Sequence, residues 1–323
     1  MGQPAVETAA ASEPLELVEA ACCICGTDDA QPLAVGEDFE YRTSPDSFRA
    51  VRCNGCGLIY LNPRPEGAAL ARAYPASYHA FDFSEERYGV VFKVRRRLEA
   101  RRLLASCQGL GDEPRVLDIG CGDGFHLRLL RDFGGTHLRL EGVDADPRAV
   151  QAARRSGLHV HQGLVERLGL PQAAYDLAIL IQTIEHVEDP AGLLRTVLAL
   201  LRPGGRLLVV TDNVATLDFR LFAGRHWGGY HFPRHLNLFS RATLRALAVQ
   251  TGFEVAELGT QVSPVNWVYS VRNLLVDYRA PRVLVERFSL EAPVALAAFT
   301  ALDWTSHALG HGALLRAVLR RPR

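Results

Sequence analysis

Four cysteines near the N-terminus have the spacing of a metal site. They form two C-x2-C pairs separated by 27 residues: Cys22, Cys25, Cys53 and Cys56. A glycine follows each pair and accepts the positive φ angle that closes such a turn. Two turns with two thiolates each supply the four ligands of a closed tetrahedral zinc site. We therefore predict a structural zinc ribbon over residues 21–65. Two alternatives stay open: Cys23 could join a C-x-C ligand set, or the turns could hold free thiols.

A glycine-rich acidic loop is the second group that could do chemistry. Residues 118–124 contain three glycines, and Asp144 stands 24 residues after Gly120 at the end of a second strand pattern. A carboxylate in that place can accept both hydroxyls of a ribose. A dinucleotide fingerprint needs glycine at the sixth position, which here is Phe125, and Asp123 would repel a pyrophosphate. The loop therefore favours S-adenosylmethionine, which carries an ammonium and a sulfonium, over NAD.

The elements around this loop alternate between strand and helix patterns. Amphipathic helical patterns begin at Asp146, with Pro147 behind it, and at Asp189, with Pro190 behind it. Apolar runs predict strands at 116–119, 138–143, 159–161, 177–181, 207–210 and 253–258, with a final candidate at 314–319. Strands without polar alternation, separated by helices, indicate a parallel sheet covered on both faces. We therefore expect a doubly wound, Rossmann-like α/β domain.

Together these motifs resemble the successive motifs of class I S-adenosylmethionine-dependent methyltransferases. The similarity covers residues 115–260 in order, through 116–124, 142–144, 175–176, 184–187 and 201–205. With the cysteine pairs and residues 61–65 and 232–240, the whole chain is similar to the subset that carries a zinc ribbon. Many members of that subset act in sugar, surface-polysaccharide or natural-product pathways. The resemblance implies methyl transfer to a small-molecule or sugar-linked acceptor.

The resemblance also implies where the cofactor binds. The loop after Asp118 would hold the methionine end, Asp144 the ribose and residues 163–165 the adenine, with the methyl group near Gln182. The implied cofactor-binding residues are Asp118, Gly120, Cys121, Gly122, Asp123, Gly124, Asp144, Ala145, Asp146, Gly163, Leu164, Val165, Gln182 and Thr183. Leu164 departs from the acidic or polar residue usual in the family. The adenine amino group would then need another partner, such as a backbone carbonyl.

A hydroxyl or enolisable carbon acceptor also needs a base, for which histidine is suited near neutral pH. The candidate catalytic residues are His235, His186 and Glu185. In similar sugar C-methyltransferases a Glu-His pair occupies the place of Arg234-His235, which implies His235 as the catalytic or substrate-binding histidine. Glu185 and His186 could instead fix their loop through hydrogen bonds.

Residues before His235 supply candidates for acceptor binding. Arg234 stands where the sugar enzymes have glutamate, and this difference weakens the hypothesis of C-methylation. The guanidinium could instead hold a phosphate or carboxylate of the acceptor. Trp227 and Tyr230 could form one wall of the acceptor site. His226 and His231 are expected to be loop residues.

Composition limits the partners and the compartment. The 323 residues include 36 basic and 36 acidic side chains, and zero net charge argues against phosphate neutralisation as the main binding force. Two rivals remain: a zinc-ribbon nucleic-acid-binding protein with a cofactor-sensing domain, and an NAD-dependent oxidoreductase. We see neither a signal sequence nor a run of about 18 apolar residues, so we expect a cytoplasmic protein without a membrane span.

The chain divides into four predicted regions. A disordered tail is expected over 1–20, the zinc ribbon over 21–65, a linker with lid helices over 66–112, and the methyltransferase domain over 113–323. An apolar helical insertion is expected near 264–312. Its most hydrophobic run, 292–302, predicts a buried helix or a subunit interface rather than a membrane contact.

Overall fold

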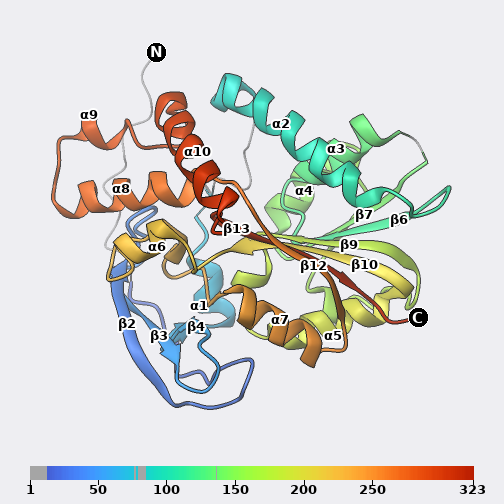
Figure 1. The fold of residues 1–323 in the computed structure, drawn as a ribbon, viewed down its shortest axis with the longest axis horizontal. Coiled ribbons are helices and arrows are strands. Elements are labelled where there is room, and N and C mark those ends of the chain that lie inside the picture. The colour runs from blue at the N-terminus through green and yellow to red at the C-terminus, as the bar shows by residue number, and fades with distance from the viewer. Residues whose placement is uncertain (1–12, 76–77, 79–84, 136) are drawn as a thin grey trace.

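The computed structural model describes residues 13–75, 78, 85–135 and 137–323. Within them, the strands of the main sheet are β6 (Arg115–Ile119), β7 (Arg139–Asp144), β8 (Val160–Gln162), β9 (Tyr175–Ile181), β10 (Leu201–Asp212), β12 (Glu254–Gln261) and β13 (Leu314–Arg320). Their spatial order is β12-β13-β10-β9-β6-β7-β8, and the sheet crosses the right half of Figure 1. The neighbours from β10 to β8 are parallel, whereas β13 runs antiparallel to β10 and β12. The order reverses between β6 and β9, where ligands bind in such sheets.

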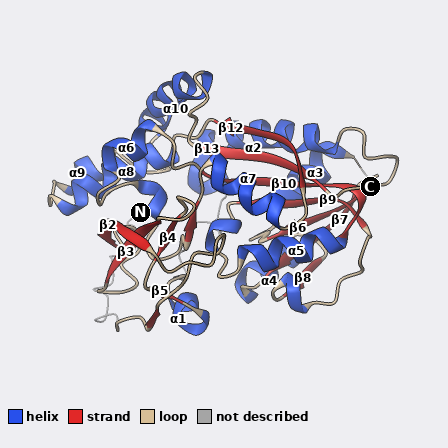
Figure 2. Ribbon diagram, turned by 60° about the horizontal axis from the view of Figure 1, so that its bottom comes forward, coloured by secondary structure: helices blue, strands red, loops and turns tan. Residues whose placement is uncertain are grey.

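Helices cover both faces of this sheet, as Figure 2 shows. On one face α2 (Glu85–Cys107) and α3 (Phe125–Gly134) pack in a cluster that contains Leu177, and α4 (Pro147–Arg155) packs beside α3. On the other face α5 (Pro190–Leu200) and α7 (Arg241–Gln250) pack in a cluster that contains Ala178. Adjacent residues of β9 therefore lie in opposite apolar layers, which explains the absence of polar alternation. The predicted doubly wound fold is confirmed.

The N-terminal ribbon is a separate antiparallel sheet that borrows one strand from the large domain. Its own strands are β2 (Ala30–Glu37), β3 (Ser47–Cys53) and β4 (Ile59–Leu61). The fourth strand, β11 (Asn237–Leu238), pairs with β4. Figure 1 shows this sheet in blue at the lower left, apart from the main sheet. The ribbon and the predicted catalytic segment around His235 are therefore joined through backbone pairing.

The predicted disordered tail is wrong for the described residues 13–20. Strand β1 (Leu17–Val18) pairs with β5 (Arg64–Pro65), and the Leu15 side chain is buried. The Leu15 N–H also donates to Asp46 Oδ2 at 2.7 Å. A two-residue strand is too short to show periodicity, so no sequence pattern predicts it. Residues 1–12 lie outside the described residues.

Two helices occupy the predicted linker and lid region. The short α1 (Gly67–Arg72) follows the ribbon, and α2 packs on α3 rather than over the cofactor loop. Between them Tyr74 contacts the predicted catalytic residue His186, and Tyr78 packs against Tyr74. Part of the predicted lid, residues 76–77 and 79–84, lies outside the described residues.

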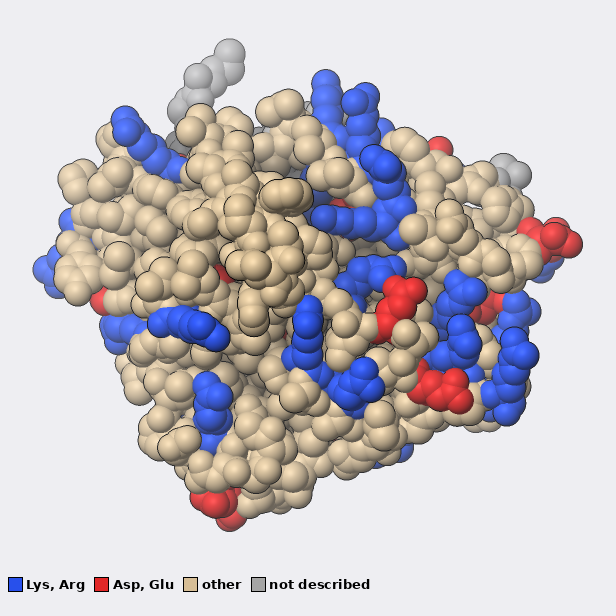
Figure 3. Space-filling model, in the orientation of Figure 1, with Lys and Arg blue, Asp and Glu red and all other residues tan. Residues whose placement is uncertain are grey.

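The predicted helical insertion is present between β12 and β13. It consists of α8 (Val265–Asp277), α9 (Arg282–Val285) and α10 (Pro293–Ala308), and α6 (Leu217–Phe222) packs against α8. Within α10 only Leu296 and Asp303 are buried, so the expectation of a buried helix is wrong, and Trp304 is 64% exposed. The area over α10 in Figure 3 is largely uncharged. A subunit interface at this surface stays a prediction.

No helix in the described part of the chain is both long and apolar enough to cross a membrane.

Candidate active site

The four predicted zinc ligands lie together at the tip of the ribbon. All four Sγ atoms are within 4.8 Å of one another, and the Cys22–Cys56 and Cys25–Cys53 Sγ pairs are each 3.4 Å apart. Thiolates about 2.3 Å from a tetrahedral zinc ion would be about 3.8 Å apart, so small shifts would seat the ion. Burial raises the pKa of Cys53, but hydrogen bonds, among them those from the backbone N–H groups of Cys56 and Gly55, together outweigh burial and lower the pKa to about 7. The donor set therefore fits zinc.

Cys23 does not belong to this cluster. Its Sγ contacts Asn237 Oδ1 of β11 at 3.4 Å, and burial raises its pKa to about 12. The Cys23 sulfur is not among the four sulfur atoms that lie within 4.8 Å of one another. Among the predicted ligand sets, the two C-x2-C pairs are the ones that the structure brings together.

The glycine-rich loop leaves β6 with its backbone turned toward the switch point. Gly120 has a φ of 72°, and a Cβ atom there would lie 2.6 Å from the Thr183 side chain. Thr183 in turn donates its hydroxyl to the Ile119 carbonyl at 3.2 Å. Because both the φ angle and the space exclude a side chain, this position requires glycine. The loop and Thr183 form one rigid surface between β6 and β9.

Asp118 is a buried carboxylate behind this loop. Its Oδ2 accepts no hydrogen bond within the described residues, and the nearby His126 Nδ1 is 3.9 Å away. Burial, with a smaller contribution from the charge of Asp144, raises the pKa of Asp118 to about 7. Burial lowers the pKa of His126 to about 4, so that imidazole carries no compensating charge near neutral pH. An unpaired buried oxygen is costly, and a cationic ligand group would satisfy it.

Asp144 is fixed by backbone N–H groups at the end of β7. Its Oδ2 accepts from the Gly122 N–H and its Oδ1 from the Asp146 N–H, both at 2.8 Å. Burial raises its pKa. Each carboxylate oxygen keeps a second lone pair, so the group can still accept two hydroxyls. Its predicted role in binding ribose therefore stays open.

Other predicted cofactor residues have structural partners. Asp146 caps α4 through the Arg148 N–H, and Asp123 accepts the Phe125 N–H at the start of α3 while it pairs with Arg128 at 2.8 Å. The remaining predicted positions follow the same edge of the sheet. Cys121 and Val165 are buried in apolar clusters, Leu164 is 48% exposed, the Gly163 N–H donates to the Asp144 carbonyl, and Gln182 Nε2 lies 3.4 Å from Asp212 Oδ2. Asp123 is thus already neutralised by an arginine.

The three predicted catalytic residues form one cluster. Glu185 and His186 belong to the short helix η3 (Ile184–His186) after β9, and His235 comes from the segment before β11. Glu185 offers a carboxylate oxygen, and each histidine a ring nitrogen, with all three atoms within 4.8 Å of one another. The two rings are 4.6 Å apart between centroids. His186 and His235, 49 positions apart in the sequence, therefore lie side by side. Helix η3 directly follows Thr183 in the chain.

Hydrogen bonds fix the two imidazoles. His235 Nδ1 lies 2.8 Å from the Gly229 carbonyl, and His186 Nδ1 lies 3.1 Å from the Arg234 carbonyl. A carbonyl only accepts, so each Nδ1 carries the proton and each Nε2 a lone pair. Burial, and then the neighbouring His186 and His231, lower the pKa of His235 well below its usual value. His235 is therefore neutral with its lone pair at Nε2, and the lowered pKa makes it a weaker base than a free imidazole.

Asp212, at the end of β10, is an acidic residue of this cluster that sequence reasoning missed. Its Oδ2 lies 3.5 Å from His235 Nδ1, and Asn266 of α8 donates to its Oδ1 at 2.8 Å. Burial raises the pKa of Asp212, and burial with the neighbouring Asp212 charge raises that of Glu185. The position of Asp212 at a strand end was a usable signal, whereas nothing in the sequence pointed to Asn266.

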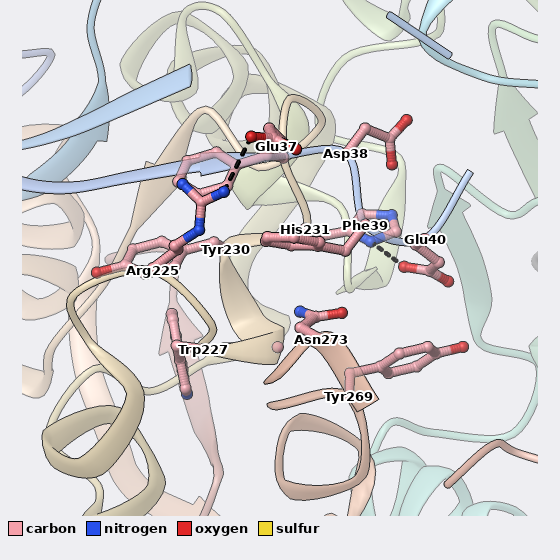
Figure 4. A pocket seen from close by; sticks show the side chains of 12 residues that line it. Glu37, Asp38, Phe39, Glu40, Arg225, Trp227, Tyr230, His231, Tyr269 and Asn273 are labelled. Carbon is pink, nitrogen blue, oxygen red and sulfur yellow. Dashed lines mark hydrogen bonds and ion pairs between the residues drawn. The ribbon is translucent and has the colours of Figure 1, made fainter. Parts of the chain in front are cut away.

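Aromatic side chains enclose the cluster on the ribbon side. The Tyr74 hydroxyl lies 3.0 Å from His186 Nδ1, and the rings of Tyr78 and Tyr41 pack beside Tyr74 and His231. A small pocket opens next to His231, between the 37–40 turn, the 225–232 loop and α8 (Figure 4). There His231 Nδ1 pairs with Glu40 at 2.6 Å. The expectation that His231 is only a loop residue missed this position.

Trp227 and Tyr230, the predicted acceptor contacts, mainly pack inside the fold. Both side chains are 1% exposed, and Trp227 Nε1 donates to Asp218 at 2.7 Å. Both residues belong to the ribbon-side apolar cluster around Phe48, although they also border the pocket in Figure 4 near η4 (Gly228–Tyr230). They support the wall of the pocket more than they form its surface.

Arg234 does not have the predicted freedom to hold an anionic acceptor. The residue is fully buried, and Asp38 takes two of its bonds, at 3.1 and 2.8 Å. The other donors reach the Ala73 and Phe232 carbonyls and the Thr43 hydroxyl. All five N–H groups of the guanidinium are therefore occupied within the chain. This side chain ties the ribbon to the catalytic segment instead of binding substrate.

Comparisons with known proteins show the family of this chain. Residues 69–258 match a family model described as a methyltransferase domain. The chain is 31% identical to the ubiquinone biosynthesis O-methyltransferase of Bordetella avium, over 56% of this chain and 79% of that protein. It is 31% identical to that of Aromatoleum aromaticum, over 49% of this chain and 72% of that protein.

A solved S-adenosylmethionine-dependent methyltransferase from Archaeoglobus fulgidus has 18% identity and a TM-score of 0.48, covering 73% of this chain and 97% of that one. The family match covers more than half of the chain and includes the glycine-rich loop and the Glu185–His186 pair. The protein belongs to the S-adenosylmethionine-dependent methyltransferases of class I.

Proposed function

We propose that this methyltransferase transfers the methyl group of S-adenosylmethionine to a hydroxyl oxygen of a small molecule. In this reaction the S–CH3 bond breaks as the O–CH3 bond forms, and the acceptor loses its proton. The observation that carries the proposal is the cluster of Glu185, His186 and His235 beside Thr183. Curated relatives are named as O-methyltransferases, which agrees with a hydroxyl acceptor.

The cofactor half of the site has a role for each charged group. The unpaired Oδ2 of Asp118 would accept the methionine ammonium, and Asp144 would accept the ribose hydroxyls with its remaining lone pairs. The exposed Leu164 would lie against the adenine by apolar contact. Gln182, held near Asp212, would face the transferred methyl. We expect the catalytic cluster to receive the acceptor on the other side of that methyl.

The acceptor would enter through the aromatic enclosure formed by Tyr41, Tyr74 and Tyr78 with the three histidines. Aromatic walls exclude water and favour a planar or apolar acceptor body, while the imidazoles and carboxylates receive its hydroxyl. In-line placement and desolvation then supply much of the rate acceleration. We propose that a structural zinc ion in the cysteine cluster holds the ribbon that forms this enclosure.

The two rival functions have less support. An NAD-dependent oxidoreductase is disfavoured by Phe125 at the sixth position of the loop. A nucleic-acid-binding role would require a basic surface, yet the formal net charge is zero. On the face in Figure 3 basic side chains form several groups, and acidic side chains lie among those at the right.

Ligand-induced stabilisation tests the proposal. A ligand that binds the folded state raises the unfolding midpoint, so S-adenosylhomocysteine should raise it and NAD should not. Incubation with methyl-labelled cofactor and an extract of small molecules should then yield a labelled methyl ether. A missing shift with S-adenosylhomocysteine would refute the cofactor, and label on carbon or nitrogen would refute the hydroxyl acceptor.

A further inference from the structure

We propose that Glu185, His186 and His235 bind a divalent first-row transition cation next to the transferred methyl group. The inference deepens the proposed function, because it names how the acceptor hydroxyl is held and activated. Two imidazoles and one carboxylate are a ligand set that suits zinc, iron, cobalt or manganese better than magnesium, which prefers oxygen.

The spacing of the donor atoms supports this site. One carboxylate oxygen and one nitrogen from each ring lie within 4.8 Å of one another. Ligands with bonds of about 2.1 Å to one cation are about 3.0 to 3.4 Å apart. Because 4.8 Å is an upper limit on these separations, small shifts that keep the existing hydrogen bonds would bring the three donors to such distances. The three residues come from two segments that the Leu236 N–H bond to the Glu185 carbonyl, at 2.7 Å, holds together.

Each candidate ligand is already oriented by a second group. Both histidines direct Nδ1 to a backbone carbonyl, of Gly229 for His235 and of Arg234 for His186. Histidines that bind metals usually donate their other ring N–H in this way, which presents the lone pair to the ion. Glu185 Oε2 accepts from the Thr211 hydroxyl at 2.8 Å. The cluster thus has the supporting contacts of a metal site.

Glu185 supplies a second, independent observation. The residue is 0% exposed, and its Oε1 accepts no hydrogen bond within the described residues. Leaving a buried carboxylate oxygen without a partner costs free energy unless a ligand compensates it. No arginine or lysine forms an ion pair with Glu185 in the described part of the chain. A bound cation would supply the missing positive charge.

Two other clusters of possible metal ligands lie in the described residues, and neither has a buried carboxylate oxygen without a partner. The cysteine cluster is the proposed structural site of the ribbon. The cluster of Glu141, His159 and His161 lies on β7 and around β8, where Arg115 and Tyr175 already bond to Glu141. An arginine beside the carboxylate disfavours a cation there. Glu185 has no such competitor.

A cation at this cluster would bind the acceptor oxygen and favour loss of its proton to water. The electron pair of the oxygen then attacks the methyl carbon, and the electrons of the S–CH3 bond return to sulfur. The reaction needs no oxidant or reductant, so a redox-inert ion such as zinc is sufficient.

Metal titration of the full chain tests the inference. After dialysis against a chelator that leaves the cysteine cluster loaded, calorimetry with Zn²⁺ should show one further ion per chain. The variants His235→Ala and Glu185→Gln should lose that binding, whereas His137→Ala, which removes an exposed histidine far from the cluster, should keep it. Unfolding midpoints would show that the variants are folded, and Glu185→Gln preserves the side-chain shape.

The outcome separates this inference from the proposed function. Stoichiometric binding that both cluster variants lose, together with turnover restored by Zn²⁺ or Mn²⁺, supports the cation. Full turnover by the chelator-treated enzyme with no further ion bound overturns it and leaves His235 as a general base. Absence of S-adenosylhomocysteine binding would instead overturn the proposed function, whatever the metal content.

Discussion

The two halves of the site, which meet at Thr183, are built in different ways. In the cofactor half, Asp144 is held by the N–H groups of Gly122 and Asp146, all within 25 residues of one another. In the acceptor half, His235, Glu185 and Asp212 are buried side chains from three separate segments. The cofactor half is therefore organised by its local backbone. The acceptor half depends on how the ribbon and the insertion pack on the sheet.

The connection between the ribbon and the acceptor half is short. Strand β4 pairs with β11, the Leu61 N–H donates to the Leu236 carbonyl, and Leu236 bonds back to Glu185. On the other side, Asn266 of the insertion holds Asp212. No comparable contact in the described residues joins the ribbon sheet to the glycine-rich loop. Damage to the ribbon should therefore affect turnover more than cofactor binding.

The largest effect should follow from breaking the cysteine cluster. In Cys53→Ser we expect loss of one zinc ion per chain, because the site loses one of four thiolates. Turnover should fall about 100-fold or more, while affinity for S-adenosylhomocysteine stays within about threefold. Metal analysis, steady-state kinetics and calorimetry measure the three quantities.

The matched control for this change is Cys107→Ser, a half-buried cysteine of α2 outside the cluster. It should leave the metal content unchanged. A Cys53→Ser protein with full turnover would show that the acceptor half does not depend on the ribbon. A parallel loss of cofactor affinity would show that the two halves are not separable.

An intermediate effect should follow from removing the buried ion pair that joins the ribbon to the catalytic segment. Arg234→Met leaves Asp38 buried without its partner, and breaking such a pair costs about 3–5 kcal/mol of unfolding free energy. Urea unfolding measures this cost. The control Arg225→Met removes a partly exposed arginine that pairs with Glu37 and Asp277 and should cost about 1 kcal/mol or less.

The same pair predicts a pH dependence. Burial raises the pKa of Asp38, but hydrogen bonds and charge from Arg234 outweigh burial and leave the pKa below its usual value. A carboxyl whose folded-state pKa is lowered stabilises the fold above its unfolded pKa, near 4. This contribution is lost as the pH falls through the folded pKa. The stability difference between wild type and Arg234→Met should therefore shrink in acid, and a constant difference would contradict the ion pair.

The contrast between the halves also explains what the sequence could predict. Asp118, Asp144 and the glycines lie in contiguous patterns, so their place at one edge of the sheet follows from strand and helix periodicity. The Arg234–Asp38 pair spans 196 residues, and β11 is two residues long, so no local pattern indicates either. The sequence predicts Arg234 as a substrate ligand because it replaces the glutamate of similar sugar enzymes. That prediction is wrong because Asp38, 196 residues away, binds the guanidinium inside the fold. The exposure of α10 likewise depends on where the insertion packs.

The smallest effect should be local to the cofactor half. Asp146 caps α4, so Asp146→Ala should cost about 1 kcal/mol of unfolding free energy. Because the Asp146 N–H also bonds to Asp144, a disturbed cap should weaken S-adenosylhomocysteine binding a few fold. The control Ser240→Ala removes the cap of α7, which lies on the opposite face, and should cost similar stability without changing cofactor affinity. Equal affinities in the two variants would mean that Asp144 is held without help from the α4 cap, and the cofactor half would then be more rigid than its hydrogen bonds indicate.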